Sequence, residues 1–168
     1  ALKVRPVGMH DHPGGEVLDP EIVLSLAPVA EVSDPFGGPL LGFGERTGKK
    51  DFDRDAKGVS RSGAVVLIGL KDSKAVGLDC GACGYPDCKS LDQQAKKEKE
   101  FSGPVCAFRL LDMGIAIGSA VKTASMLNAD NRIMYRIGTV AREMKMVDWD
   151  FVMGIPLAAT GKNIFFDR

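Results

Sequence analysis

The placement of the four cysteines constrains this chain more than any other feature. In a chain of 168 residues, Cys80, Cys83 and Cys88 are separated by two and by four residues, and Cys106 follows after seventeen intervening residues. A loop that gathers three thiolates around one point, with a fourth supplied by the fold, is typical of a tetrahedral thiolate site. Three interpretations fit this set: a [4Fe–4S] cluster, a structural zinc ion and a pair of disulfides.

The spacing favours the cluster. Two intervening residues let one tight turn place two sulfurs on neighbouring metal ions, and Gly81 and Gly84 let the backbone curl and direct N–H groups at sulfur. A zinc site usually pairs two short Cys-x2–4-Cys motifs, whereas Cys106 stands alone. Disulfides are typical of exported proteins, and the N-terminus lacks the basic region and apolar core of a signal peptide. We therefore expect one cluster and a reducing, cytoplasmic location.

Helices are expected to begin beside the cysteines. Asp87 can cap a helix over residues 88–100, which places Cys88 in its first turn. Cys106 shortly precedes a second helix, predicted over residues 113–127. The positive N-terminal ends of helices favour thiolates and the negative charge of a reduced cluster.

The strand pattern lies in residues 51–168, which we expect to form one α+β domain after a loop-rich segment. Residues 64–70 are continuously apolar and β-branched, as in a strand buried on both faces. Residues 151–155 are a second strand candidate, which Pro156 is expected to end, and residues 163–166 are a third.

The helix pattern completes this fold class. Residues 51–60 predict a short charged helix, and residues 113–127, apolar nearly all round, predict a buried core helix. A helix over residues 130–146 is expected to pack beside it through a stripe of apolar side chains: Ile133, Ile137, Val140, Met144 and Val147. The expected architecture is a small sheet packed with a buried helix pair, with an iron–sulfur loop inserted at about residues 78–108.

Residues 1–50 predict mostly loops. They hold six of the nine prolines and eight of the twenty glycines, and such a composition marks turns. A helix is expected over residues 22–29, after an Asp-Pro pair that suits a helix start. His10, His12 and Glu16 are ligand types for a divalent ion, but the Pro-Gly-Gly beside them favours a solvated turn.

Charge and hydropathy exclude several classes of function. Acidic and basic residues balance at 22 each, so we expect neither nucleic-acid binding nor attraction to an anionic membrane. The longest nearly uncharged apolar run, residues 113–121, is far shorter than the ~20 residues that span a bilayer. The chain shows no acid–base constellation for hydrolysis, and Gly161-Lys162 is not spaced as in a nucleotide-binding loop, although such a turn can hold one phosphate.

The cysteine stretch also resembles a known module. LDCGACGYPDC, residues 78–88, with Cys106 at this distance, resembles the single-cluster [4Fe–4S] module of electron-transport-complex B subunits and of corrinoid iron–sulfur proteins. The resemblance implies ligation by Cys80, Cys83, Cys88 and Cys106, electron transfer, and a redox partner protein. A lysine-rich run follows, which would either steer an acidic partner or form a solvated face: Lys89, Lys96, Lys97 and Lys99.

A wider resemblance covers residues 50–168. FDRDAKGVSRSGAVVLIG, CAFRLLDMGIAIGSAV, ADNRIMYRIGTVA and GIPLAATGKNIFFDR resemble the conserved uncharacterised ferredoxin-domain family of anaerobic bacteria and archaea. The layout is also similar to the nitroreductase-like flavin fold, in which a central helix resembles the one with Gly114-Ile115-Ala116 and a strand resembles Gly154-Ile155-Pro156. This similarity implies an α+β domain, a homodimer and bound FMN.

Three functions remain open from the sequence. The leading hypothesis is a one-cluster electron-transfer protein. The second is an iron–sulfur flavoenzyme, an oxidoreductase with FMN between the glycine-rich helix and Gly161-Lys162. The third is an interaction domain stapled by zinc through the same four cysteines.

Overall fold

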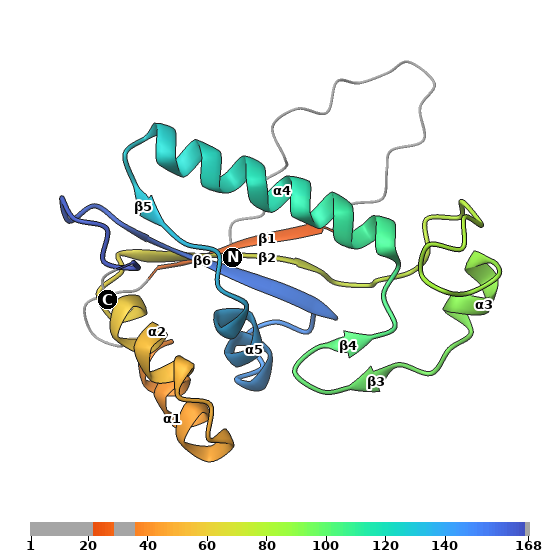
Figure 1. Ribbon diagram of the computed structural model, residues 1–168, viewed down its shortest axis with the longest axis horizontal. Coiled ribbons are helices and arrows are strands. Elements are labelled where there is room, and N and C mark those ends of the chain that lie inside the picture. The colour runs from red at the N-terminus through yellow and green to blue at the C-terminus, as the bar shows by residue number, and fades with distance from the viewer. Residues whose placement is uncertain (1–21, 29–35, 167–168) are drawn as a thin grey trace.

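A four-stranded antiparallel sheet with the strand order β1-β2-β6-β5 runs through the centre of the molecule (Figure 1). The computed structural model describes the backbone of residues 22–28 and the complete residues 36–166. The sheet strands are β1 Ile22–Pro28, β2 Ala64–Leu70, β5 Asp130–Asn131 and β6 Phe151–Ala158. A separate hairpin is formed by β3 Lys97–Glu98 and β4 Ser102–Gly103. Together with the helices, these elements make a single α+β domain, as the sequence predicts.

Strand β2 carries the two cores of the domain. Val65 and Leu67 pack into one core, and Ile68 and Leu70 into the other on the opposite face of the sheet. Each of these four side chains is at most 1% exposed. The prediction of a strand buried on both faces is therefore confirmed, because period-two alternation with apolar residues at every position supplies both layers.

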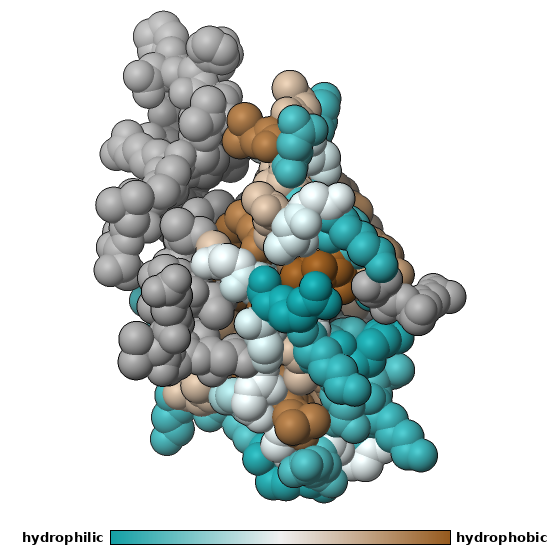
Figure 2. Space-filling model, turned by 90° about the vertical axis from the view of Figure 1, so that its left-hand side faces the viewer, coloured by the Kyte–Doolittle hydropathy of each residue, from teal (hydrophilic) through white to brown (hydrophobic). Residues whose placement is uncertain are grey.

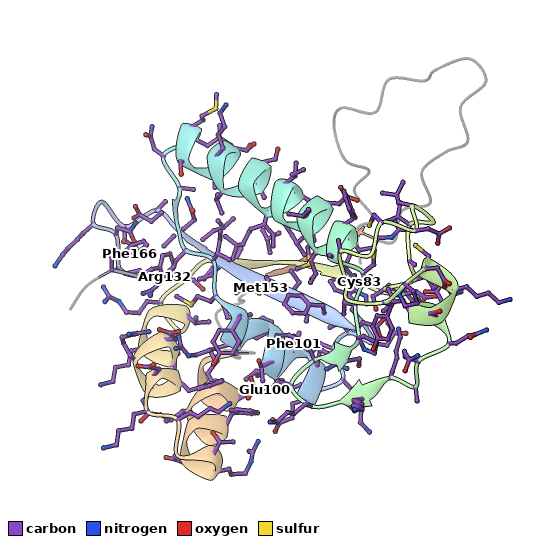
Figure 3. All side chains as sticks on the ribbon, turned by 45° about the vertical axis from the view of Figure 1, so that its right-hand side comes forward. Cys83, Glu100, Phe101, Arg132, Met153 and Phe166 are labelled. Atoms are coloured by element: carbon purple, nitrogen blue, oxygen red, sulfur yellow. The ribbon has the colours of Figure 1, made fainter. Side chains whose placement is uncertain are left out.

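Three helices cover one face of the sheet and one helix covers the other (Figure 1). Helices α1 Gly37–Thr47, α2 Asp51–Val59 and α5 Tyr135–Glu143 lie on the first face, and α4 Ala107–Met126 lies on the second. Helix α2 confirms the short charged helix predicted over residues 51–60. In the view of Figure 3, Met153 of β6 lies between the sheet and α4, in accord with its packing against the core on that face.

Helix α5 approaches β6 without side chains to separate the backbones. A Cβ atom added at Gly138 would lie 1.9 Å from the carbonyl oxygen of Val152, and one at Gly154 would lie 2.3 Å from Cγ2 of Ile137. Real Cβ atoms do not tolerate such distances, so both positions require glycine. The Gly-x-Pro strand of the sequence is thus a packing feature of the α5–β6 contact.

Helix α4 differs from the prediction in its start and in its burial. It begins at Ala107, and of its twenty residues Met113 and Ile117 alone are buried. Ile115 is 72% exposed and Leu111 is 60% exposed. The prediction of a buried core helix is wrong, because α4 is the outermost layer on its face of the sheet and its far side meets no described element.

The N-terminal predictions were wrong in two places. Residues 22–28 form β1, which pairs with β2 along its whole length, and not a helix, because a short apolar run satisfies either period. Residues 37–47 form α1 within the segment expected to be loops. Burial of Leu40 and Phe43 in the core outweighs the low helix propensity of the glycines. The His10–Glu16 stretch lies outside the described residues.

The C-terminal predictions were also too simple. Helix α5 is shorter than expected, since Ile133 and Met144 are 43% and 42% exposed. Strand β6 continues through Pro156. On the side of β6 that faces β5, the strand is paired at Gly154 with Met134 and from Leu157 onwards with β5. Pro156 lies between these two contacts, so its missing N–H leaves no hydrogen bond of the sheet unmade. Residues 163–166 form a turn and not a strand.

Candidate metal centre

All four cysteines line one cavity at the end of the molecule where α4 begins. The cavity is small and partly open to solvent. Figure 3 shows Cys83 in the loop between β2 and α3, beside the first turn of α4. Other lining residues are mostly apolar or glycine: Val76, Leu78, Gly81, Tyr85, Asp87 and Phe108. The fold therefore brings together the residues that the sequence predicts as one site.

The four sulfurs differ in their exposure. Cys106 is 4% exposed and occupies the N-cap position of α4. Cys83 and Cys88 are half-buried, and Cys80 is exposed. Cys106 therefore lies at the N-terminal end of a twenty-residue helix, which carries partial positive charge.

Two glycines shape the loop that carries the first pair of cysteines. Gly81 and Gly84 have φ values of 71° and 83°, in the left-handed region that side chains rarely adopt. The N–H of Gly84 donates to the carbonyl of Gly81 at 2.9 Å. This turn reverses the backbone between Cys80 and Cys88, as predicted from the spacing.

Asp79 is a site residue that the sequence reasoning missed. Its N–H lies 3.3 Å from Sγ of Cys88, and its Oδ1 accepts a hydrogen bond of 2.8 Å from the N–H of Cys88. Its φ of 48° is also in the left-handed region, where Asp is better tolerated than most residues. Its position directly before Cys80 was the available signal, since Asp side chains often bind nearby backbone N–H groups.

Helix α3 confirms the predicted cap but not the predicted length. The carboxylate of Asp87 accepts from the N–H of Ser90 at 2.7 Å, and hydrogen bonds from the backbone and side chain of Ser90 lower the pKa of Asp87. The helix spans Cys88–Asp92, well short of residue 100. The sequence after Leu91 is polar on every side and offers no apolar face to hold a longer helix.

The segment that carries Cys80, Cys83 and Cys88 is held to the rest of the domain by contacts near its two ends. Asp92 accepts a hydrogen bond of 2.8 Å from the N–H of Ala75. Asp150, at the start of β6, accepts from the N–H and the hydroxyl of Ser73 at 2.9 and 2.8 Å and forms an ion pair with Lys96. Ser73 and Lys96 lie at either end of the segment, so one buried carboxylate closes it.

Asp150 is ionised in this setting. Burial opposes its ionisation, but the hydrogen bonds from Lys96 and Ser73 outweigh burial and hold the pKa of Asp150 below its ordinary value. Lys96 thus forms an ion pair that closes the segment, although its side chain is 40% exposed; Lys89, Lys97 and Lys99 are exposed as well. The lysine run therefore divides into a structural member and three surface charges.

No single-ion site is formed by the donors that the structure describes. Within residues 36–166, no three His, Cys, Asp or Glu side chains are placed to hold one metal ion. Yet four cysteines converge on one cavity.

The glycine-rich elements that the flavin hypothesis used do not meet in a described cavity. Gly161 has a φ of 74° and lies in a turn. Neither the cysteine cavity nor the larger polar cavity beside α5 is lined by Gly114, Gly118 or Lys162. Among the described helices, none is both long and apolar enough to cross a lipid bilayer.

Comparison with known proteins relates part of the chain to a family. An uncharacterized protein of Archaeoglobus fulgidus is 52% identical over 121 residues, which are 72% of this chain and 66% of the relative. The chain thus spans just under two thirds of that relative's length. No solved structure gives a significant match.

The family match covers the C-terminal part of the chain. Residues 102–168 match the family described as "Uncharacterized protein containing a ferredoxin domain (DUF2148)". This range includes Cys106, α4, α5 and β6 and begins after the loop with the other cysteines. Over residues 102–168, the predicted similarity to the ferredoxin-domain family is confirmed.

Proposed function

We propose that this chain is an iron–sulfur protein that holds one [4Fe–4S] cluster and acts in electron transfer. The ligands would be Cys80, Cys83, Cys88 and Cys106. The observation that carries the proposal is the convergence of all four cysteines on one cavity with mostly apolar walls. The ferredoxin domain named in the description of the matched family supports the same class of function.

The spacing of the cysteines along the chain favours a cluster over zinc. A structural zinc is usually held by two short Cys-x2–4-Cys motifs, whereas Cys106 stands alone, after seventeen residues that separate it from Cys88. The Cys-x2-Cys-x4-Cys loop and the distant Cys106 nevertheless line one cavity, and in a cube each of four thiolates binds a different iron.

The chain would contribute anchoring and tuning. When bound, such a cluster takes up and releases one electron, at a potential set by hydrogen bonds to sulfur and by solvent exposure. Buried Cys106 fixes the site to the start of α4, and the N–H of Asp79 lies within hydrogen-bonding distance of the Cys88 sulfur. The donor set and its surroundings therefore fit the group.

A redox partner protein would approach the exposed side of the site, at Cys80. The surface lysines beyond α3, Lys97 and Lys99, would favour an acidic partner by steering it. The location would be the cytoplasm, where a reducing environment keeps the four thiols free of disulfides. If the protein is an enzyme, the cluster makes it an oxidoreductase.

Removal of the ligands one at a time tests the proposal. Replacement of any one of the four cysteines with Ala should abolish the broad visible absorption that bleaches on reduction of the anaerobically purified protein. Ala82→Ser alters the same loop without removing a thiol and should leave the absorption unchanged. Full absorption in Cys106→Ala would show that the fourth ligand is assigned wrongly.

A further inference from the structure

The outer side of α4 carries a stripe of exposed residues with the spacing of a helix-packing seam. Its members recur at intervals of three and four residues and form what we call the outer stripe: Phe108, Leu111, Ile115, Gly118 and Lys122. Alternation of three and four is the spacing at which one helix faces another. The first three are 36%, 60% and 72% exposed, so the described chain leaves this seam uncovered.

Apolar exposure continues to the far end of the same helix. Met126 and Leu127 are 73% and 75% exposed, and Figure 2 shows hydrophobic residues reaching the surface at the end of the molecule where α4 finishes. A helix of twenty residues is about 30 Å long. An uncovered seam of that length, apolar at both ends, fits a partner helix better than a small contact at the cysteine site, and exposed apolar patches mark interaction surfaces.

Two charged residues on the outer side of α4, one within the outer stripe and one next to it, identify the partner. Asp112 and Lys122 are both exposed, and neither forms an ion pair within the described part of the chain. Ten residues, or about 15 Å of helix, separate them. If a second α4 lay parallel, Lys122 would face Lys122; if it lay antiparallel about a two-fold axis at the level of Ile117, Asp112 of each copy would face Lys122 of the other.

The same register matches large residues with small ones. Residues whose numbers add to 234 face each other, so Ile115 of one copy lies opposite Ser119 of the other, next to Gly118. A Cβ atom added at Gly118 would meet nothing within 4 Å, so this part of the helix is open to a neighbouring side chain. An isologous contact of this kind buries the same surface on both copies, as a closed dimer requires.

We infer that two copies of this chain form an antiparallel dimer through the outer stripe of α4. The dimer also completes the candidate metal centre, a part of the inference that rests on the proposed function. Phe108 lines the cysteine cavity, and the register places Met126 of the partner copy over it. Each copy therefore covers the apolar rim of the other copy's site with the end of its α4.

Charge reversal tests the register. The full chain, purified anaerobically, should sediment at the mass of a dimer. Asp112→Lys or Lys122→Asp alone should weaken the dimer at least tenfold, because like charges then face each other across the contact. The double variant Asp112→Lys/Lys122→Asp should restore it, and failure to do so would overturn the antiparallel register.

Disruption of the seam tests the interface itself. Ile115→Asp should give a monomer with unchanged circular dichroism, whereas Met144→Asp, a matched change at an exposed methionine on the other face of the sheet, should remain dimeric. A monomeric wild-type chain, or a dimer that Ile115→Asp and the charge reversals leave intact, would overturn the inference and assign the seam to another occupant, such as a redox partner.

Cluster content separates this inference from the proposed function. The Ile115→Asp monomer should retain iron but lose it in air at least several-fold faster than the dimer. Equal rates of loss would overturn the covering role of Met126 while leaving the dimer. A dimer that holds no iron would instead count against the proposed function alone.

Discussion

At the scale of single residues, the candidate site depends on groups that differ in how visible they are in the sequence. The four cysteines are recognisable because no other residue type offers a thiolate and their spacing is specific. Asp79 and Asp150 are not recognisable in this way. Their importance comes from contacts with the Cys88 backbone and with Ser73 and Lys96, and acidic residues of this kind are common on any surface.

Asp150→Asn should reduce stability in a pH-dependent manner. The pKa of Asp150 is held below its ordinary value of about 3.9, so the carboxylate's contribution to stability is fully present when the pH is well above that ordinary value. This contribution is lost as the pH falls through the lower pKa of the folded state. At pH 7 the substitution should lower the free energy of unfolding by about 1–2 kcal/mol, and the difference should shrink as the solution is made acidic.

Urea unfolding of the cluster-free protein at each pH checks this expectation without interference from acid loss of a cluster. Asp148→Asn is the matched control, because Asp148 is 79% exposed and its loss should change stability by less than about 0.5 kcal/mol. If the difference in stability between Asp150→Asn and wild type did not change with pH, the ionised Asp150 carboxylate would not be the group that stabilises this segment.

At the scale of helices and strands, the sequence predicted an element correctly where its apolar periodicity matches its burial, and failed where tertiary packing overrides local propensity. Strand β2 and helix α2 were predictable because their apolar periodicity matches their burial. Strand β1 and helix α1 were not, because strand pairing with β2 and burial of Leu40 and Phe43 override local propensity. The early start of α4 at Ala107 also escaped prediction, since none of residues 107–112 is buried in the core.

Gly138→Ala should open the contact between α5 and β6. The added methyl group would fall 1.9 Å from the carbonyl oxygen of Val152, and because this oxygen belongs to the backbone of a central strand it cannot move aside easily. We expect a loss of about 1–3 kcal/mol or more in the free energy of unfolding, measured by urea titration.

Gly42→Ala, a substitution in helix α1, should change the free energy of unfolding in the opposite direction. Its Cβ would meet only the end of the Arg46 side chain, at 3.7 Å, so removal of glycine flexibility should raise stability by about 0.5–1 kcal/mol. If both variants changed stability in the same direction, the close approach of α5 and β6 would be contradicted.

At the scale of the whole molecule, the cysteine site is built into the fold. Its loop leaves the end of β2, its fourth cysteine directly precedes α4, and Asp150, just before β6, closes its base. The prediction of a single α+β domain is confirmed, but the predicted packing of the two C-terminal helices beside each other is wrong, because α4 and α5 lie on opposite faces of the sheet. The sequence does not predict that α4 is an outer layer, because an all-apolar helix suits a core and an interface between copies equally well.

The most direct test of the central claim is the metal content of the anaerobically purified chain. The proposed [4Fe–4S] cluster predicts four iron and four acid-labile sulfide per chain and no zinc. Bound flavin, measured in the same sample, would extend the function to a flavoenzyme without altering this count. One zinc per chain with neither iron nor sulfide would contradict the proposal and identify the four cysteines as a structural zinc site.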